Sequence, residues 1–184
     1  RSNNIVVGAS RLNNLIVMPG QTVSVSDTIL PRTRANGYKE AGVYVNGAHT
    51  TGLGGGVCQI SSTLYRVVFE TGMEVTYRRS HTFEPNYVTP GQDATISWDM
   101  PDFRFVNTSE GAIGIRASYA DQKATVSIYG IPVLDDGVTW KLYSEKTEEG
   151  EKPEPQYVED PTLAPGTEKV KSNGTTGSTW VTYK

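Results

Sequence analysis

The sequence predicts a small α+β domain in which a few short helices pack on antiparallel strands, followed by a β-rich C-terminal extension. Apolar residues recur with helical spacing in two segments, one at the start of the chain and one directly after a run of glycines. Short β-type segments bounded by Gly, Pro, Asn or Asp fill much of the remainder. The 184 residues include nineteen glycines, ten prolines and ten tyrosines, a composition typical of a turn-rich, mainly β chain.

The first elements are a short helix and two short strands. Asn3 and Asn4 are good N-cap residues, and the apolar side chains that follow share one helical face, which predicts a helix over residues 4–13. An apolar run over residues 15–18 ends at a Pro-Gly turn signal, and residues 22–26 alternate with a period of two. Both of these segments are predicted to be strands.

A polar stretch separates these strands from the next element. Residues 27–42 contain proline and glycine and are predicted to hold at most one turn of helix, around residues 38–41. A short strand is expected over residues 43–45. It leads into Asn46-Gly47, a dipeptide that strongly favours a hairpin turn.

The second predicted helix follows the glycine run. Ile60, Leu64 and Val68 lie on one face of a helical pattern, and Gly72 stands where a C′ glycine would end the helix. After this helix the pattern changes to strands, which would pack on the helices as in other α+β domains. The predicted strands cover residues 73–78, 94–98, 102–106, 113–118 and 125–129.

The composition changes toward the C-terminus. Residues 145–155 are acidic, contain proline and are nearly without apolar side chains, which indicates an exposed connector or a hairpin excursion. Pro-Gly and Asn-Gly turns separate the β-type pieces of the tail, at residues 157–158, 169–170 and 180–183. We therefore expect one domain over residues 1–134 and a linker with a β extension over residues 135–184.

The composition also excludes some classes of partner. Seventeen Lys and Arg residues stand against twenty Asp and Glu residues, a formal net charge of −3, and there is no basic tract to neutralise phosphates. We therefore expect no nucleic-acid partner. No apolar run approaches the roughly 20 residues that a membrane-spanning helix needs. Since the chain opens on Arg1 rather than Met, any contact with a membrane is expected to come from segments absent from this chain.

The most informative motif is the glycine run with the only cysteine close behind it. Gly54, Gly55 and Gly56 let the backbone take a positive φ and let a ligand or another backbone come close. A helix that begins just after the run directs unpaired N–H groups and the positive end of its dipole at whatever lies in the turn. The thiol of Cys58 would have a physical reason to ionise there.

Several motifs together resemble one known family. They are residues 19–24 (PGQTVS), 37–41 (GYKEA), 54–65 (GGGVCQISSTLY), 87–91 (YVTPG) and 93–95 (DAT), with Arg79 and His81. Over about residues 1–130 this set is similar to the VanW-like family of bacterial surface proteins. The tail resembles part of a G5-type module, an all-β surface domain, through residues 165–170 and 177–183.

The resemblance implies a location more than a reaction. VanW-like proteins are exported, membrane-tethered or wall-associated, mainly in Gram-positive bacteria, and the family takes its name from an accessory gene of vancomycin-resistance clusters. The resemblance therefore implies an extracellular protein at the cell surface or in the cell wall, with peptidoglycan or a wall glycan as its partner. A reaction has to be inferred from the residues themselves.

The first functional hypothesis is an enzyme. Nucleophilic catalysis by a thiol needs a nearby base and a group that orients the base. Cys58 is the candidate nucleophile, and His81 and Asp93, which match the family pattern, are the candidate base and its partner. The N–H groups of Gln59 and Ile60 at the helix start would be available to an oxyanion. Acyl transfer or hydrolysis on peptidoglycan or its peptide is the expected reaction.

The second hypothesis is a non-catalytic module that binds peptidoglycan or another wall glycan. Its ligand would lie on the glycine turn and in a cleft of aromatic side chains. The predicted ligand-binding residues are Gly54, Gly55, Gly56, Gln59, Ser61 and Arg79. The predicted cleft aromatics are Tyr44, Tyr65, Tyr87 and Trp98. A spacer that holds other domains away from the membrane is the third possibility.

Each candidate catalytic residue also has a purely structural interpretation. A free cysteine behaves as a small hydrophobic residue and is often buried, so Cys58 could serve packing alone. His81 lies between Arg79 and Phe83, where a hydrogen-bonded histidine in a strand or turn is equally compatible with the sequence. Asp93 follows a Pro-Gly turn, a setting in which aspartate commonly bonds the local backbone.

No cofactor and no metal are predicted. His, Cys and carboxylates do not occur at the spacing of a metal site, and the glycine run lacks the pattern of a nucleotide-binding loop. Carboxylates such as Asp99 and Asp102 are expected to be solvated. Arginines that could bind an anionic wall polymer or a peptide carboxylate, depending on their geometry, are Arg32, Arg34, Arg78 and Arg79.

Overall fold

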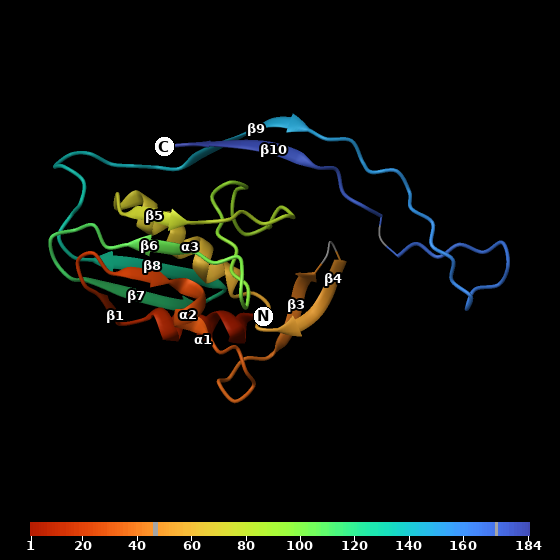
Figure 1. The fold of residues 1–184 in the computed structure, drawn as a ribbon, viewed down its shortest axis with the longest axis horizontal. Coiled ribbons are helices and arrows are strands. Elements are labelled where there is room, and N and C mark those ends of the chain that lie inside the picture. The colour runs from red at the N-terminus through yellow and green to blue at the C-terminus, as the bar shows by residue number, and fades with distance from the viewer. Residues whose placement is uncertain (46–47, 172) are drawn as a thin grey trace.

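A computed structural model describes residues 1–45, 48–171 and 173–184 of the chain, without the side chains of residues 44, 45, 48 and 49. Within this range short helices pack on antiparallel sheets, and a β-rich C-terminal part follows (Figure 1). This is the α+β fold that the sequence predicts.

Both predicted helices are confirmed. The first helix, α1 (Ser2–Leu12), buries Ile5, and the longer helix α3 (Cys58–Glu70) buries Ile60, because the apolar residues of each helix fall on one face. Gly72 follows the last turn of α3 with a φ of 78°, and its N–H donates to the carbonyl of Phe69. It therefore ends the helix as a C′ glycine does.

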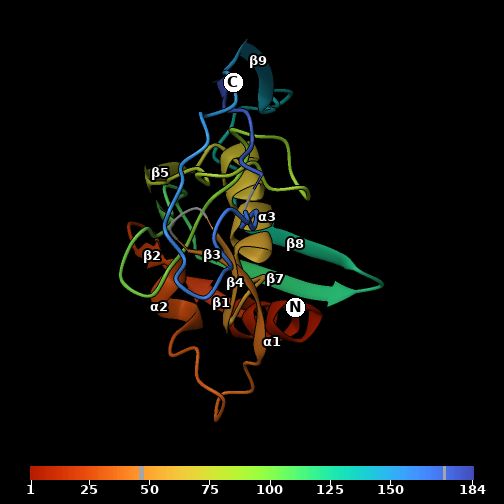
Figure 2. The same ribbon diagram turned by 90° about the vertical axis from the view of Figure 1, so that its right-hand side faces the viewer.

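Two three-stranded antiparallel sheets form the body of the domain. The strand order is β1-β7-β8 in the first sheet and β2-β6-β5 in the second. Helix α1 packs on β7, and α3 packs on strands of both sheets, β8 and β5. Figure 2 shows β7 and β8 as a hairpin that projects beside α3. The bounds are β1 (Leu15–Val17), β2 (Thr22–Ser24), β5 (Glu74–Tyr77), β6 (Arg104–Val106), β7 (Ile113–Ala120) and β8 (Lys123–Tyr129).

One hydrophobic core joins α3 to the second sheet. The ring of Tyr65, on α3, lies 5.6 Å from that of Phe103, which in turn lies 5.8 Å from Phe105. Tyr65 is 7% exposed and both phenylalanines are fully buried. Burial of each ring contributes about 1.5–3 kcal/mol to folding. Tyr65 is thus a core residue, and the prediction that it lines a cleft is wrong.

The strand predicted over residues 22–26 ends early. Strand β2 stops at Ser24, and a short helix, α2 (Val25–Ile29), follows. The hydroxyl of Ser24 caps this helix by accepting a hydrogen bond from its first turn, and Asp102 accepts another from the N–H of Ser26. Asp102 is 1% exposed, so the expectation that it is solvated is also wrong.

The helical turn predicted over residues 38–41 is replaced by extended chain. Strand β3 (Glu40–Val45) begins there and pairs antiparallel with β4 (Ala48–Leu53). Tyr38 is buried, and its hydroxyl donates to the carbonyl of Ile29 at 2.8 Å, which holds the segment against α2. The predicted turn at Asn46-Gly47 and the side chain of Tyr44 lie outside the described residues.

The strand predicted over residues 94–98 does not form. The segment is irregular, and side chains of α3 hold its backbone: the hydroxyl of Ser61 donates to the carbonyl of Ala94 at 2.6 Å, and the Ala94 N–H donates to the hydroxyl of Ser62 at 3.0 Å. Ala94 and Ile96 are buried. Burial alternates along residues 94–97 of this loop, so its sequence shows the same alternation of apolar and polar residues as a strand.

The tail forms a two-stranded antiparallel sheet of β9 (Tyr143–Glu149) and β10 (Ser178–Tyr183). The strand predicted at residues 180–183 is confirmed, and part of the predicted acidic connector lies within β9. The pieces predicted at residues 157–158 and 169–170 form no strand, and belong to the long excursion that extends from the body (Figure 1).

The tail sheet contacts the loops that follow β5. The side-chain amide of Gln92 donates to the carbonyl of Leu142 at 3.3 Å, and the indole N–H of Trp180 donates to Glu84 at 2.9 Å. None of the helices in the described part of the chain is long and apolar enough to cross a membrane.

Candidate active site around Cys58

The glycine run turns the chain sharply against β3. Gly54 and Gly56 have φ angles of 84° and 105°, which other residues rarely adopt. A Cβ atom on Gly55 would lie 2.5 Å from the carbonyl oxygen of Gly42, so only glycine lets the two backbones approach this closely. The structure thus confirms both predictions for the glycine run, the positive φ angles and the close approach of another backbone segment. Cys58, two residues after the run, is the first residue of α3.

Cys58 lies at the edge of the core and not within it. Its side chain is half-buried and packs against core residues on one side. The Sγ atom lies 3.4 Å from the carbonyl oxygen of Ile96, and the thiol lies close enough to the side chain of His81 to raise the pKa of the imidazole. The thiol is therefore partly accessible and near an imidazole.

His81 is bound by Asp93 through two contacts to the same oxygen. Its Nδ1 atom lies 2.5 Å from Oδ2 of Asp93, and its backbone N–H donates to that oxygen at 2.6 Å. The Asp93 side chain is 1% exposed. Since the carboxylate occupies Nδ1, Nε2 is left for other partners, and the hydroxyl of Tyr87 lies 3.3 Å from it. The structure thus brings together Cys58, His81 and Asp93.

The neighbours of His81 favour its protonated form. Burial alone would lower the pKa of His81, but the hydrogen bonds to Asp93 and Cys58, with the negative charges of both groups, outweigh burial and raise it from 6.5 to about 9. His81 therefore holds a proton at neutral pH. The imidazolium donates at both nitrogens, so it can offer one proton to a leaving group while Asp93 balances its charge.

Arg78 holds Asp93 from the other side. Its Nη2 atom lies 3.2 Å from Oδ1 of Asp93, and its Nε donates to the Asp93 carbonyl at 2.6 Å. Burial would raise the pKa of Asp93, but the hydrogen bonds from His81 and the charge of Arg78 outweigh it and lower that pKa. Asp93 is thus a fixed negative charge at neutral pH. It both orients the imidazole and binds the local backbone.

Two groups predicted to face a ligand are engaged within the protein. The N–H groups of Gln59 and Ile60 donate to carbonyl oxygens in the turn before α3, so the prediction that they are available to an oxyanion is wrong. Ser61 is fully buried, and its hydroxyl donates to the carbonyls of Ala94 and Cys58. Its position indicates that it anchors a loop to α3 and does not contact a ligand.

Arg78, and not the predicted ligand-binding residue Arg79, contacts Asp93. Arg79 has an exposed side chain, whereas Arg78 makes the contacts with Asp93. Strand β5 ends at Tyr77, directly before the two adjacent arginines, and the place where it ends decides which of them points toward Asp93. No sequence motif specifies where this strand ends. Among the described residues, no group of three or more His, Cys, Asp and Glu side chains is arranged to hold a metal ion.

Two of the predicted cleft aromatics contact residues near the thiol: Tyr87 contacts His81, and Trp98 contacts Arg32. Burial and the charges of Cys58 and Asp93 raise the pKa of Tyr87, which keeps its hydroxyl protonated beside His81. Trp98 is 46% exposed, and the guanidinium carbon of Arg32 lies 5.2 Å from its ring centroid. Of the four arginines considered in the sequence, Arg32 is the one that is buried. This burial results from tertiary packing, so the sequence could not distinguish Arg32 from the other three.

The glycine turn, the helix behind it and the His–Asp pair all lie in a segment that matches a known family. Residues 1–129 match the family model described as "VanW like protein". The chain belongs to the VanW-like family. Residues 143–184 match the model of the G5 domain, so the VanW-like domain carries a G5-type tail.

Two curated relatives of this VanW-like chain come from Gram-positive bacteria. It is 42% identical over 135 residues to the uncharacterized protein YoaR of Bacillus subtilis (strain 168), which covers 73% of this chain and 45% of YoaR. It is 30% identical over 131 residues to the vancomycin B-type resistance protein VanW of Enterococcus faecalis (strain ATCC 700802 / V583), covering 68% of this chain and 48% of that protein. The chain thus spans about half the length of each relative. No solved structure matches it.

The two families indicate where such a protein acts. VanW-like and G5 domains are typical of surface or wall-associated proteins of Gram-positive bacteria. The two domains thus indicate a cell-wall-associated protein.

Proposed function

We propose that this VanW-like domain is a cysteine enzyme of the cell surface that transfers or hydrolyses acyl groups of peptidoglycan peptides. The observation that carries the proposal is that a half-buried thiol, Cys58, interacts electrostatically with an imidazole, His81, whose Nδ1 is bound by the buried carboxylate of Asp93. A thiol, a proton carrier and an orienting carboxylate are the parts that nucleophilic catalysis needs. The two families support the peptidoglycan setting.

The first half-reaction forms a thioester. The reactive form of the pair is the one in which the imidazole of His81 carries the proton of the thiol. The Cys58 thiolate attacks the carbonyl carbon of a peptide bond, so that a C–S bond forms and the carbonyl electron pair moves to oxygen. When that pair returns, the C–N bond breaks and the leaving amine takes the proton from Nε2 of His81.

The second half-reaction releases the acyl group. Water or the amine of a second peptide attacks the thioester carbonyl and gives its proton to the imidazole of His81, which is now neutral. The C–S bond then breaks, and its electron pair returns to the sulfur of Cys58. Water as acceptor gives hydrolysis, and an amine gives acyl transfer. Asp93 keeps the same nitrogen of His81 bound throughout and balances its charge.

Intact-protein mass spectrometry tests this function. The purified chain is incubated with peptidoglycan stem peptides and quenched in acid, which preserves thioesters. We expect a mass increase equal to one acyl group, located on Cys58 and lost on addition of an acceptor amine. Product formation that survives in Cys58→Ala, or the absence of both adduct and product in the unmodified chain, contradicts the proposal.

Two further variants are used in this assay, one to test the role of His81 and one as a control. His81→Gln is expected to slow adduct formation by about 10²-fold or more, because it removes the proton donor. Arg34→Gln changes an exposed arginine that pairs with Glu40 and should leave the rate unchanged.

A non-catalytic binding module is the second candidate, and the exposed ring of Trp98 favours it. Retention on purified peptidoglycan distinguishes the two. A binding module would lose retention in Trp98→Ala, keep it in Cys58→Ala and form no adduct with any stem peptide.

A further inference from the structure

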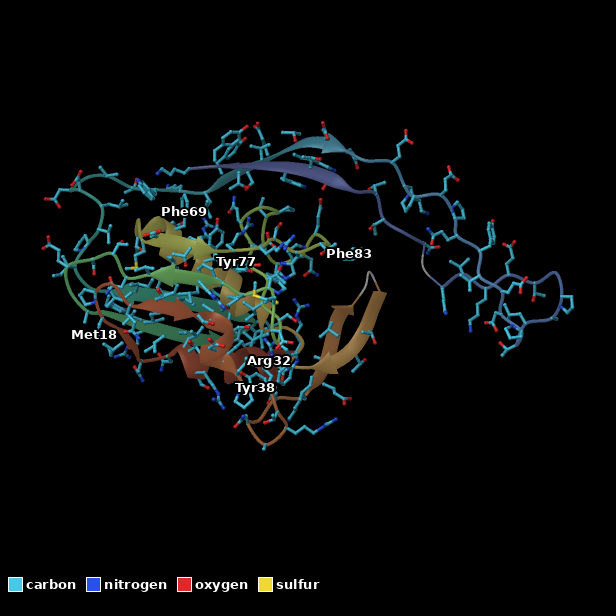
Figure 3. All side chains as sticks on the ribbon, in the orientation of Figure 1. Met18, Arg32, Tyr38, Phe69, Tyr77 and Phe83 are labelled. Carbon is cyan, nitrogen blue, oxygen red and sulfur yellow. The ribbon has the colours of Figure 1, made fainter. Side chains whose placement is uncertain are left out.

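Arg32 carries a buried charge that has no carboxylate partner among the described residues. It lies between α2 and β3, close to Tyr38 (Figure 3), and is 3% exposed. Its Nη1 atom is shielded from solvent and has no hydrogen-bond partner among the described residues. Because an arginine in a protein does not lose its proton, the charge persists. A buried cation of this kind normally lies against an anion.

Several other arginines of the domain already bind carboxylates of the chain. The pairs are Arg34–Glu40 at 2.5 Å, Arg66–Glu70 at 2.9 Å, Arg78–Asp93 at 3.2 Å and Arg104–Asp102 at 2.7 Å. Arg32 belongs to no ion pair within the described residues, although it is the most deeply buried of these arginines. No carboxylate of the described residues thus occupies its guanidinium.

The guanidinium of Arg32 belongs to the site around Cys58. A Cβ atom on Gly54 would lie 3.0 Å from Cδ of Arg32, so the side chain passes directly against the glycine run. Its guanidinium carbon lies 5.2 Å from the ring centroid of the exposed Trp98, and its charge interacts with that of Cys58. Thiol, guanidinium and exposed ring thus form one site at the start of α3.

We propose that Arg32 binds the C-terminal carboxylate of the substrate, so that the domain selects peptides that end in a free carboxylate close to the bond attacked by Cys58. This inference rests on the proposed function and names its substrate class. A guanidinium presents its N–H donors in one plane and matches both oxygens of a carboxylate. The ring of Trp98, stacked against Arg32, would hold that plane in place.

Calorimetric titration tests the proposal without chemistry. The Cys58→Ala variant is titrated with a synthetic peptidoglycan stem peptide that has a free C-terminal carboxylate, and with the same peptide as its C-terminal amide. We expect the free acid to bind at least about tenfold more tightly. Adding Arg32→Gln should weaken binding of the free acid to the level of the amide, whereas adding Arg34→Gln should keep the preference.

Three results of the titration would overturn the proposal. They are equal binding of the two peptides by Cys58→Ala, no binding of the free acid, and a preference that survives Arg32→Gln. If Arg32→Gln does not fold, as judged by circular dichroism, Trp98→Leu takes its place, since it leaves the guanidinium present but removes the stacked ring. An undiminished preference in a folded Trp98→Leu variant would also overturn the proposal.

The thioester assay separates this inference from the proposed function. A carboxylate preference in the titration, with no adduct on Cys58, contradicts the function and leaves the role of Arg32 standing. Adducts that form at the same rate from acid and amide contradict the role of Arg32 only. If Arg32 served only as the counter-ion of a Cys58 thiolate, Arg32→Gln would slow adduct formation from both peptides equally. That result would also overturn the inference.

Discussion

The imidazole of His81 and the carboxylate of Asp93 meet at a single oxygen atom. Both the ring Nδ1 and the backbone N–H of His81 bind Oδ2 of Asp93, at 2.5 Å and 2.6 Å. The other oxygen, Oδ1, lies against Arg78. The position of the ring, its tautomer and its charge therefore all depend on one buried carboxylate.

Replacing that carboxylate by an amide should affect charge more than shape. In Asp93→Asn the imidazolium loses its counter-charge, so we expect thioester formation on Cys58 to fall by about 10²-fold to 10⁴-fold, as when the aspartate of a known catalytic triad is replaced. NMR titration of the His81 ring should show a pKa well below the value of about 9 in the parent chain. Asp136→Asn, at an exposed site, is the control. An unchanged ring titration in Asp93→Asn would refute the assigned pairing.

The stability of the fold should depend on the protonation of His81. Its pKa is raised from 6.5 to about 9 in the folded state, so the folded chain binds this proton more tightly than the unfolded chain does. The resulting stabilisation of the folded chain is complete below pH 6.5, the pKa of His81 in the unfolded chain. It is lost as the pH rises through about 9, the pKa of His81 in the folded chain. We expect the free energy of unfolding in urea to fall by about 2–3 kcal/mol over this window.

Variants at the site assign that pH dependence. His81→Gln should remove the fall, and Cys58→Ala should reduce it, because the thiol contributes to the raised pKa of His81. A fall of the same size in His81→Gln would show that another group causes it.

A methyl group at Gly55 should be more disruptive than one at a glycine in open space. A Cβ atom there would meet the carbonyl oxygen of Gly42 at 2.5 Å, so Gly55→Ala must push β3 away from the turn. We expect a loss of about 1–3 kcal/mol and a changed reactivity of Cys58 toward iodoacetamide. Gly177→Ala is the matched control, since Gly177, like Gly55, does not have a positive φ, and no atom lies within 4 Å of its Cβ position. Equal losses in the two variants would contradict the role of close approach.

Asp102 should matter to stability and not to chemistry. Its carboxylate binds Ser24, Ser26, Phe103 and Arg104. Burial raises the pKa of Asp102, but these hydrogen bonds outweigh it and lower that pKa, so the stabilisation is present above the ordinary value of 3.8 and is lost as the pH falls. Asp102→Asn should cost about 1–3 kcal/mol in urea unfolding at neutral pH.

The same variant separates folding from activity. Folded Asp102→Asn should form the Cys58 adduct at the parental rate, and Asp99→Asn, at an exposed site of the same loop, should change neither quantity. A large loss of adduct formation at intact stability would place Asp102 in the site.

Elements whose periodicity coincides with their burial could be predicted from the sequence. Helix α3 and strand β7 bury the apolar face that their patterns define, and β8 buries Val126 and half-buries Ile128 on one face, so the pattern and the structure agree. The segment over residues 94–98 shows where this fails. Its alternation reflects burial against α3, and its backbone is held by Ser61 and Ser62 instead of a neighbouring strand. A pattern of burial does not specify which partner satisfies the backbone.

The early end of β2 has a related cause. Alternation over residues 22–26 favours a strand, but the hydroxyl of Ser24 and the distant carboxylate of Asp102 cap a helix at that point. The first cap is local and visible in the sequence as a Ser followed by Asp27. The second comes from a residue far along the chain, and its effect could not be foreseen.

The sequence alone determined the two main helices, the turn of glycines, the presence of a thiol at a helix start and the membership of the VanW-like family, because each of these depends on neighbouring residues. Only the tertiary structure decided which side chains meet that thiol. His81 and Asp93 reach it because α3 anchors the loop after β5, and Arg32 reaches it because the glycine run leaves room for its side chain. Contacts between distant segments follow from packing, which local sequence patterns do not encode.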